Sequence, residues 1–442
     1  MTTEFAGHTE RTSGPPRAGI ACAQPMGGME MKAYNFGSGF RAHMPKAIAA
    51  ALVLGMATSG ALAGDAPKDG VYADHIDWGV IMDLSGPTSS SQGVWTKGLQ
   101  DYMAMLNENG GVGGRTVNVL AEDGRFNAAN DKIAFDKLVS QTPVIALSGF
   151  GTSATQVALA SEIRDGAVPV IGTYTPTKAL SEPTSKMVYN GFCGYKQMAD
   201  AGVGYMVEKL GLKNPKVMTV AIETAGGKDY ADYVAAAVAK YGGTASSTTM
   251  KIAAVDVTPQ VQQILAEKPD FITIYGIENT AILTMKTMQQ YGLDTPGFGI
   301  TYLGTKSVYN ALGAEAGGNY SFISCFTPGG ADESDGNKAM VSFADKAGHG
   351  DLASNINYVA GWVAGMTAET ALKKVDGDLT RASLVSAIEG GFTVDPEGLA
   401  APIVYTPEDH TGPQVLKMFG YDYAKETFVS YGDYADYEKY TK

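Results

Sequence analysis

The sequence has few of the residues and motifs on which metal and nucleophile chemistry depends. Its 442 residues include five histidines and three cysteines, and they form no H-E-x-x-H, CxxC or carboxylate-rich metal loop. The glycine-rich stretch "SGFGTS" (148–153) is not a G-x-S-x-G nucleophile elbow and lacks the G-K-[ST] ending of a phosphate-binding P-loop. The sequence therefore predicts no enzyme, no catalytic residue, no metal site and no cofactor.

Positive charge is also scarce. Lysine and arginine number 33 against 46 aspartates and glutamates, which gives a net charge of −13, and there is no long basic stretch. An acidic surface repels a polyanion, so a nucleic-acid partner is disfavoured. The composition, 45% hydrophobic and 18% charged, is ordinary for a soluble protein, and the length is sufficient for two domains.

One apolar stretch stands out near the N-terminus. The basic segment "RAHMPK" (41–46) precedes "AIAAALVLGMATSGALA" (47–63), which ends in Ala-Leu-Ala. This order is typical of a secretory signal peptide. A membrane anchor is the alternative, but the run is short and contains Gly, Ser and Thr. We expect residues 1–63 to be a disordered extension plus signal peptide, cleaved near Ala63, and the mature protein to reside in the periplasm.

Short apolar runs alternate with helix-like stretches along the rest of the chain. Strands are predicted at "IDWGVIM" (76–82), "RTVNVLAED" (115–123), "PVIALSG" (143–149) and "VPVIGTY" (168–174). After residue 195 the pattern restarts, with strands predicted at 216–223, near 248–253 and at 270–276. Strands that alternate with helices indicate βαβ units and parallel sheets. Two such blocks predict an α/β protein of two lobes, each with its own sheet.

The loop at 148–156, "SGFGTSATQ", follows a predicted strand and opens a predicted helix. Small residues and hydroxyls at a helix N-terminus suit an anion, because the first N–H groups of the helix have no partner within it. The alternative is a simple helix cap, with Thr152 or Ser153 as the capping residue. The residues alone leave both interpretations open.

Four stretches together resemble one known family. They are "IDWGVIMDLSGPTSSSQG" (76–93), "NENGGVGGRTVNVLAEDGR" (107–125), "PVIALSGFGTSATQVALASEIRDGAVPVIG" (143–172) and "KPDFITIYGIENTAILTMKTMQQYGLDTP" (268–296). The chain resembles the periplasmic leucine/isoleucine/valine-binding proteins, the solute receptors of branched-chain amino acid ABC importers. The resemblance covers about residues 74 to 430. It implies two Rossmann-like lobes with parallel-sheet cores, joined by a three-crossing hinge, that close on a ligand.

The resemblance also implies a division of the chain into lobes and a ligand site. Lobe one would comprise 74–191 with 327–402, and lobe two 195–324 with 408–442. The loop at 148–156 would hold the ligand's carboxylate, with Thr152 in the hydroxyl position. The ligand-binding residues implied are Gln92, Thr152, Ser153, Tyr174, Thr175, Tyr230, Ile277, Glu278 and Tyr302.

This sequence departs from the family pattern where amino-acid binders hold the ligand's ammonium group. The position of their glutamate is occupied here by Tyr302, and a nearby aromatic position by Ile277. Either Glu278 or Glu223 replaces that carboxylate, or the ligand lacks an ammonium group, since a buried ammonium without a carboxylate is costly.

The resemblance implies a monomeric, non-enzymatic solute receptor of an ABC importer, with an inner-membrane permease as its partner. The ligand would be a branched-chain amino acid or a related small hydrophobic carboxylate. The alternatives are a sensor that presents its closed lobes to a membrane receptor, or a binder of aromatic acids, amides or urea.

Two cysteines, Cys193 and Cys325, follow the signal segment, and a pair in an oxidising compartment is a disulfide candidate. The resemblance places them where the chain crosses between the lobes. The alternative is a pair of buried free thiols.

Overall fold

The computed structural model describes residues 69–441. The expected extension, signal peptide and cleavage near Ala63 lie outside these residues. Within 69–441, no helix combines the length and apolarity that a membrane crossing requires.

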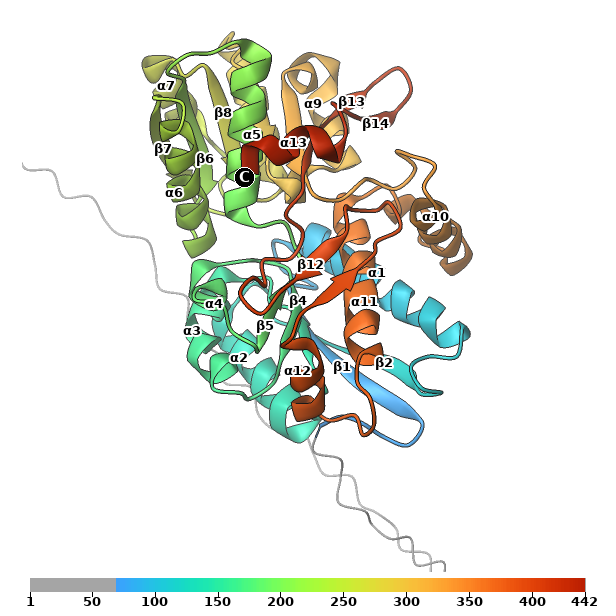
Figure 1. Cartoon of the computed structure of the whole chain (residues 1–442). Helices are drawn as coiled ribbons and strands as arrows, with labels where there is room; N and C mark the ends of the chain where they lie inside the picture. Colours follow the sequence, from blue (N-terminus) through green and yellow to red (C-terminus); the bar gives the residue numbers. More distant parts are fainter. Residues whose placement is uncertain (1–68, 442) are drawn as a thin grey trace, which may run out of the picture. The chain divides into compact units, whose positions relative to one another are not determined.

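A five-stranded sheet forms the centre of lobe one (Figure 1). All its neighbouring strands pair in parallel. Its strands, in spatial order, are β2 (Thr116–Asp123), β1 (His75–Met82), β3 (Leu147–Gly149), β4 (Val170–Thr173) and β5 (Val188–Asn190). Its helices are α1 (Ser89–Glu108), α2 (Ala128–Asp136), α3 (Ser153–Arg164), α4 (Lys178–Ser181), α10 (Asp335–Ala347), α11 (Ile356–Lys373) and α12 (Arg381–Ile388). A hairpin of β11 (Phe392–Val394) and β12 (Ile403–Tyr405) completes lobe one.

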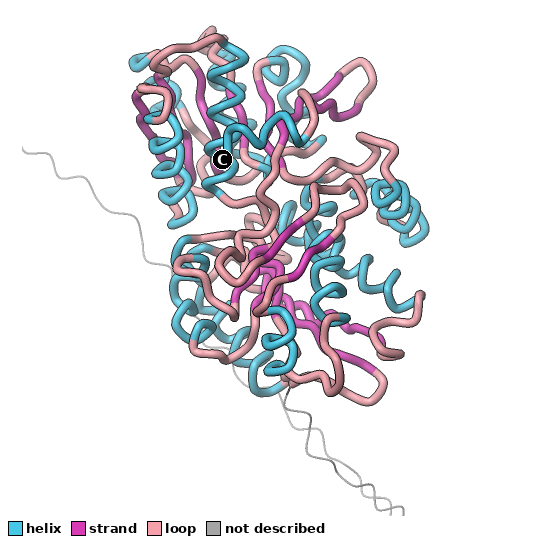
Figure 2. The backbone as a smooth tube through the Cα atoms, viewed as in Figure 1, coloured by secondary structure: helices cyan, strands magenta, loops and turns pink. Residues whose placement is uncertain are grey.

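A seven-stranded sheet forms the centre of lobe two. Its strands, in spatial order, are β14 (Thr427–Ser430), β13 (Lys417–Asp422), β10 (Tyr320–Ser324), β9 (Gly297–Gly299), β8 (Phe271–Tyr275), β6 (Lys216–Ile222) and β7 (Thr244–Met250). Strand β13 is antiparallel to β10 and β14, and the other pairs are parallel. Its helices are α5 (Tyr195–Leu210), α6 (Ala225–Ala239), α7 (Thr258–Glu267), α8 (Glu278–Gln290), α9 (Lys306–Gly318) and α13 (Tyr434–Thr441). Figure 2 shows the strands of each lobe flanked by helices. The predicted α/β class with two parallel-sheet cores is confirmed.

Two glycines let helices α1 and α11 approach closely in lobe one. A Cβ on Gly361 would lie 1.9 Å from the Trp95 carbonyl oxygen, and one on Gly98 would lie 2.1 Å from that of Tyr358. No real side chain fits at such distances, so both positions require glycine. This packing fixes helix α1, whose first turn contributes to the cavity described below.

The chain passes between the two sheets three times: after β5, after β10 and between β12 and β13. Cys193 lies just after β5 and Cys325 just after β10, and the two are joined by a disulfide with a Cα–Cα distance of 5.7 Å. Both cysteines are fully buried. The predicted pair thus ties together two neighbouring crossings of the hinge.

Candidate ligand-binding site

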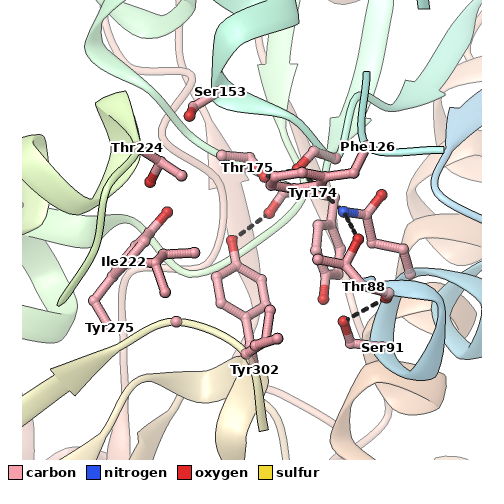
Figure 3. A pocket seen from close by; sticks show the side chains of 14 residues that line it. Thr88, Ser91, Phe126, Ser153, Tyr174, Thr175, Ile222, Thr224, Tyr275 and Tyr302 are labelled. Atoms are coloured by element: carbon pink, nitrogen blue, oxygen red, sulfur yellow. Dashed lines mark hydrogen bonds between the residues drawn. The ribbon is translucent and has the colours of Figure 1, made fainter. Parts of the chain in front are cut away.

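A cavity is lined by residues of both lobes (Figure 3). Most of the lining lies at or just after the carboxyl ends of parallel strands, where open α/β sheets bind their ligands. Lobe one contributes Thr88, Ser91, Gln92, Phe126, Gly151, Ser153, Tyr174 and Thr175, and lobe two contributes Ile222, Thr224, Tyr275, Gly276, Ile277 and Tyr302.

The N-terminus of helix α3 reaches the cavity wall at Gly151 and Ser153. The preceding turn requires left-handed backbone at Gly149 (φ 93°) and Phe150 (φ 58°). A Cβ on Gly151 would lie 1.7 Å from the Gln92 amide oxygen, so only glycine lets this loop approach helix α1. Like any helix N-terminus, that of α3 presents N–H groups that have no partner within the helix.

Thr152 caps helix α3 but does not line the cavity. Its hydroxyl oxygen accepts from the N–H of Thr155 at 3.3 Å and donates its proton to the Asp131 carboxylate at 2.8 Å. Thr152 was expected to donate its hydroxyl to the ligand's carboxylate. This expectation is corrected, because the hydroxyl already donates to Asp131 within lobe one.

Ser153, the next residue, lines the cavity instead. Its side chain is only 5% exposed, and its hydroxyl has no hydrogen-bond partner among the described residues. A hydroxyl that lines a cavity without a partner is a candidate ligand contact, since polar groups that a bound ligand covers are rarely left unsatisfied.

Gln92 lines the cavity, but hydrogen bonds occupy both ends of its amide. The amide oxygen accepts from the N–H of Asp83 at 2.8 Å, and the amide nitrogen donates to the Thr88 hydroxyl at 2.8 Å and to the Gly151 carbonyl at 3.2 Å. Thr175 donates to the same carbonyl at 3.1 Å. These bonds hold helix α1 and the loops after β3 and β4 together.

A pair of tyrosines joins the two lobes at the cavity wall. The hydroxyl of Tyr302 donates to the carbonyl of Tyr174 at 2.7 Å, and the ring centroids lie 4.7 Å apart. The Tyr174 hydroxyl donates to the side chain of Asn357 on α11 at 2.9 Å. Burial raises the pKa of both phenols far above their ordinary value, so both stay neutral. The sequence contained no signal for Asn357.

Tyr230 lies in the core of lobe two and not in the cavity lining. It is fully buried, and its hydroxyl pairs with that of Thr273 at 2.7 Å. The tyrosine that lines the cavity is Tyr275, at the end of β8, whose hydroxyl pairs with that of Tyr195 at 2.8 Å. Burial raises the pKa of Tyr275 to about 12. The expectation that Tyr230 lies in the site is therefore corrected: the lobe-two tyrosine beside it that lines the cavity is Tyr275.

Four lining residues of lobe two were not expected from the sequence: Ile222, Thr224, Tyr275 and Gly276. They end or follow strands β6 and β8. Ile277, which was expected, does line the cavity. The sequence signal that could have indicated the other four is their position at or just after the end of a predicted strand.

Neither candidate carboxylate reaches the cavity lining. Glu278 accepts a hydrogen bond from the Thr305 hydroxyl at 2.6 Å, and exposed Glu223 pairs with Lys251 outside the cavity. The lining residues include no aspartate, glutamate, lysine, arginine or histidine. Within residues 69–441 there is also no group of three or more His, Cys, Asp or Glu side chains arranged to hold a metal.

Comparison with known proteins agrees with this architecture. The family model described as periplasmic binding protein matches residues 76–426. The chain belongs to the periplasmic binding protein family. No curated protein matches the sequence.

Solved structures share the fold of this periplasmic binding protein at low identity. A fatty acid ABC transporter substrate-binding protein from Thermomonospora curvata is 20% identical with a TM-score of 0.72, covering 83% of this chain and 95% of that one. A solute binding protein from R. palustris, in complex with benzoate, is 21% identical with a TM-score of 0.69, covering 81% and 96%. A branched chain amino acid ABC transporter protein from Thermus thermophilus, with bound valine, is 17% identical with a TM-score of 0.72, covering 81% and 95%.

The cavity of this binding protein thus combines three chemical features. One wall presents a helix N-terminus and the free hydroxyl of Ser153, further hydroxyls belong to Thr88, Ser91 and Thr224, and the remaining surface is largely aromatic or aliphatic. Such a wall can stabilise a negative charge. It offers no counter-charge to a cation.

Proposed function

We propose that this protein captures a small carboxylate with an apolar or aromatic body, and without an ammonium group, for an ABC importer. The observation that carries the proposal is the cavity lining, which places an unpartnered Ser153 hydroxyl at the N-terminus of α3 and includes no charged side chain. The partner would be the importer's inner-membrane permease, and the site of capture the periplasm, reached by means of the proposed signal peptide.

The carboxylate end of the ligand would lie at α3. Free N–H groups and the helix dipole favour negative charge there, and Ser153 adds a neutral donor. The lobe-one wall continues through Thr175 and Ser91 (Figure 3), whose hydroxyls already donate to the carbonyls of Gly151 and Thr88. The anion would therefore depend on the N–H groups of α3 and on Ser153, without a lysine or arginine.

The body of the ligand would contact rings and aliphatic carbon. Tyr174, Tyr302 and Tyr275 supply ring faces, and Phe126 and Ile222 supply apolar surface. Burial of apolar area stabilises such a body by about 25 cal/mol per Å². The fatty acid and benzoate proteins among the structural relatives support a ligand of this class, whereas the valine complex supports the alternative of an amino acid.

Closure of lobe one (74–191 with 327–402) on lobe two (195–324 with 408–442) would enclose the ligand. We expect saturating benzoate or 4-methylpentanoate to raise the melting temperature, since a ligand that binds only the native state stabilises it by mass action. Small-angle scattering of the same samples should give a smaller radius of gyration with ligand than without. No thermal shift with any apolar carboxylate, in a panel that includes amino acids and amides, would contradict the proposed ligand class.

The Ser153 hydroxyl gives a single-residue test of the anion site. Ser153→Ala should weaken binding of the carboxylate probe by about 1.5–3 kcal/mol, the usual contribution of a hydrogen bond to a charged group. Isothermal titration calorimetry measures the loss. Ser161→Ala, on the exposed part of the same helix, is the matched control and should bind as the wild type does. Equal affinities of Ser153→Ala and wild type would mean that the anion lies elsewhere.

A further inference from the structure

Asp131 is a buried carboxylate in contact with the first turn of helix α3, which forms part of the cavity wall. It lies in helix α2 and is 3% exposed, and it does not line the cavity. The hydroxyls of Thr152, at 2.8 Å, and of Thr155 both donate to its Oδ2. The cap of helix α3 is therefore anchored on this single carboxylate.

The other oxygen of Asp131 contacts a second segment of the cavity wall. A Cβ on Gly124 would lie 1.6 Å from Asp131 Oδ1, so the backbone of Gly124 rests against the carboxylate. Gly124 begins the loop that carries Phe126 into the lining, with Phe126 in left-handed backbone at φ 53°. Asp131 thus contacts both the cap of helix α3, which precedes Ser153, and the backbone of Gly124, which precedes Phe126.

No positive charge neutralises Asp131 among the described residues. The charged groups that face it, Asp83 after β1 and Asp123 at the end of β2, are both acidic. The nearby cations pair elsewhere: Lys132 with Asp136 and Glu162, Lys137 with Glu122, and Arg125 with Asp123. Burial, together with the charges of Asp83 and Asp123, raises the pKa of Asp131, although the two threonine hydroxyls oppose that rise.

We propose that Asp131 is a positioning residue whose charge sets the preference of the cavity between anionic and neutral ligands. This inference rests on the proposed function. When ionised, Asp131 accepts the hydrogen bonds of Thr152 and Thr155 and places a like charge behind the ligand's carboxylate. When protonated, it is neutral and that repulsion is removed.

The sign of the pH dependence follows from the raised pKa of Asp131. Lowering the pH towards that pKa protonates Asp131 in a larger fraction of the molecules, so the affinity for a carboxylate ligand should rise. By linkage, a bound carboxylate should raise the pKa of Asp131 further, and binding should take up a fraction of a proton. A neutral amide with the same body should show neither effect.

The test compares benzoate with benzamide on the wild type and on Asp131→Asn at pH 7.5. Asparagine keeps the size and an acceptor oxygen but removes the charge. The ratio of benzoate affinity to benzamide affinity should rise on the order of tenfold, as expected for removing one like charge several ångströms away. A merely structural disturbance would change both affinities together. Asp136→Asn, at the exposed end of the same helix, is the matched control and should leave the ratio unchanged.

Calorimetry in two buffers of different ionisation enthalpy, repeated as the pH is lowered towards the pKa of Asp131, gives a second readout. Wild type should take up protons when benzoate binds, and Asp131→Asn should take up markedly fewer. Benzoate binding with an unchanged ratio and unchanged proton uptake in Asp131→Asn would overturn this inference while leaving the proposed function intact. Failure of every apolar carboxylate to bind the wild type would overturn both.

Discussion

Replacing both hinge cysteines with serine should lower the free energy of unfolding by about 4–5 kcal/mol. The disulfide closes a loop between residues 132 positions apart, and in the chain-entropy model a loop of that length restricts the unfolded chain by about this amount. Urea unfolding of wild type and of Cys193→Ser/Cys325→Ser, followed by circular dichroism, measures the difference.

The local packing indicates that the serine variant still folds. The sulfur of Cys193 lies 3.1 Å from the Thr301 hydroxyl and 3.1 Å from the N–H of Cys325, so a serine hydroxyl at this position has partners. Reduced wild type is the control and should lose a similar amount of stability. A double-serine variant as stable as the oxidised wild type would show that the bond does not constrain the unfolded chain.

The strands that the sequence predicted best are the buried ones. β1 was predicted at 76–82 and spans His75–Met82. The prediction was accurate because a strand covered on both faces is a continuous apolar run, whose ends are easy to recognise. β7 was predicted near 248–253 but spans Thr244–Met250. It is an edge strand of polar, largely exposed residues, so the apolar letters that follow it drew the prediction past its end.

The sequence predicted which loops line the cavity better than it predicted which of their side chains face it. Ser153, Tyr174, Thr175 and Tyr302 were expected and line the cavity. The direction of the Thr152 hydroxyl was not predictable, because it depends on Asp131, which lies 21 residues earlier on a different helix. Pattern along one chain does not reveal which hydroxyl finds a buried acceptor.

The dependence on contacts between distant residues also explains why the expectations for Tyr230 and Glu278 in lobe two were wrong. Tyr230 and Tyr275 are both buried tyrosines whose rings lie 5.7 Å apart, and the sequence does not say which of them faces the cavity. Glu278 adjoins the lining residue Ile277, yet it bonds Thr305 instead. In each case tertiary contacts between residues distant in sequence decide the outcome.

The second large expected effect is discrimination against an ammonium group. 4-Methylpentanoate is leucine without its α-amino group, so the pair isolates that group. We expect 4-methylpentanoate to bind at least about 100-fold more tightly than leucine, because desolvating a charged group without a partner costs several kcal/mol. Calorimetric titration of both ligands at pH 7.5 measures the ratio.

The expectation depends on the side chain at position 302. Related amino-acid binders are expected to have a glutamate here, whereas Tyr302 offers the ammonium only a neutral ring and a hydroxyl already donated to Tyr174 at 2.7 Å. Tyr302→Glu should therefore shift the ratio towards leucine, and Tyr302→Gln, which has nearly the same shape without the charge, is the matched control. Leucine binding to wild type as tightly as 4-methylpentanoate would mean that Glu278 leaves Thr305, or Glu223 leaves Lys251, to pair with the ligand. Leucine titrations of Glu278→Gln and Glu223→Gln would then identify the carboxylate, since only the variant that removes the pairing group should lose leucine affinity.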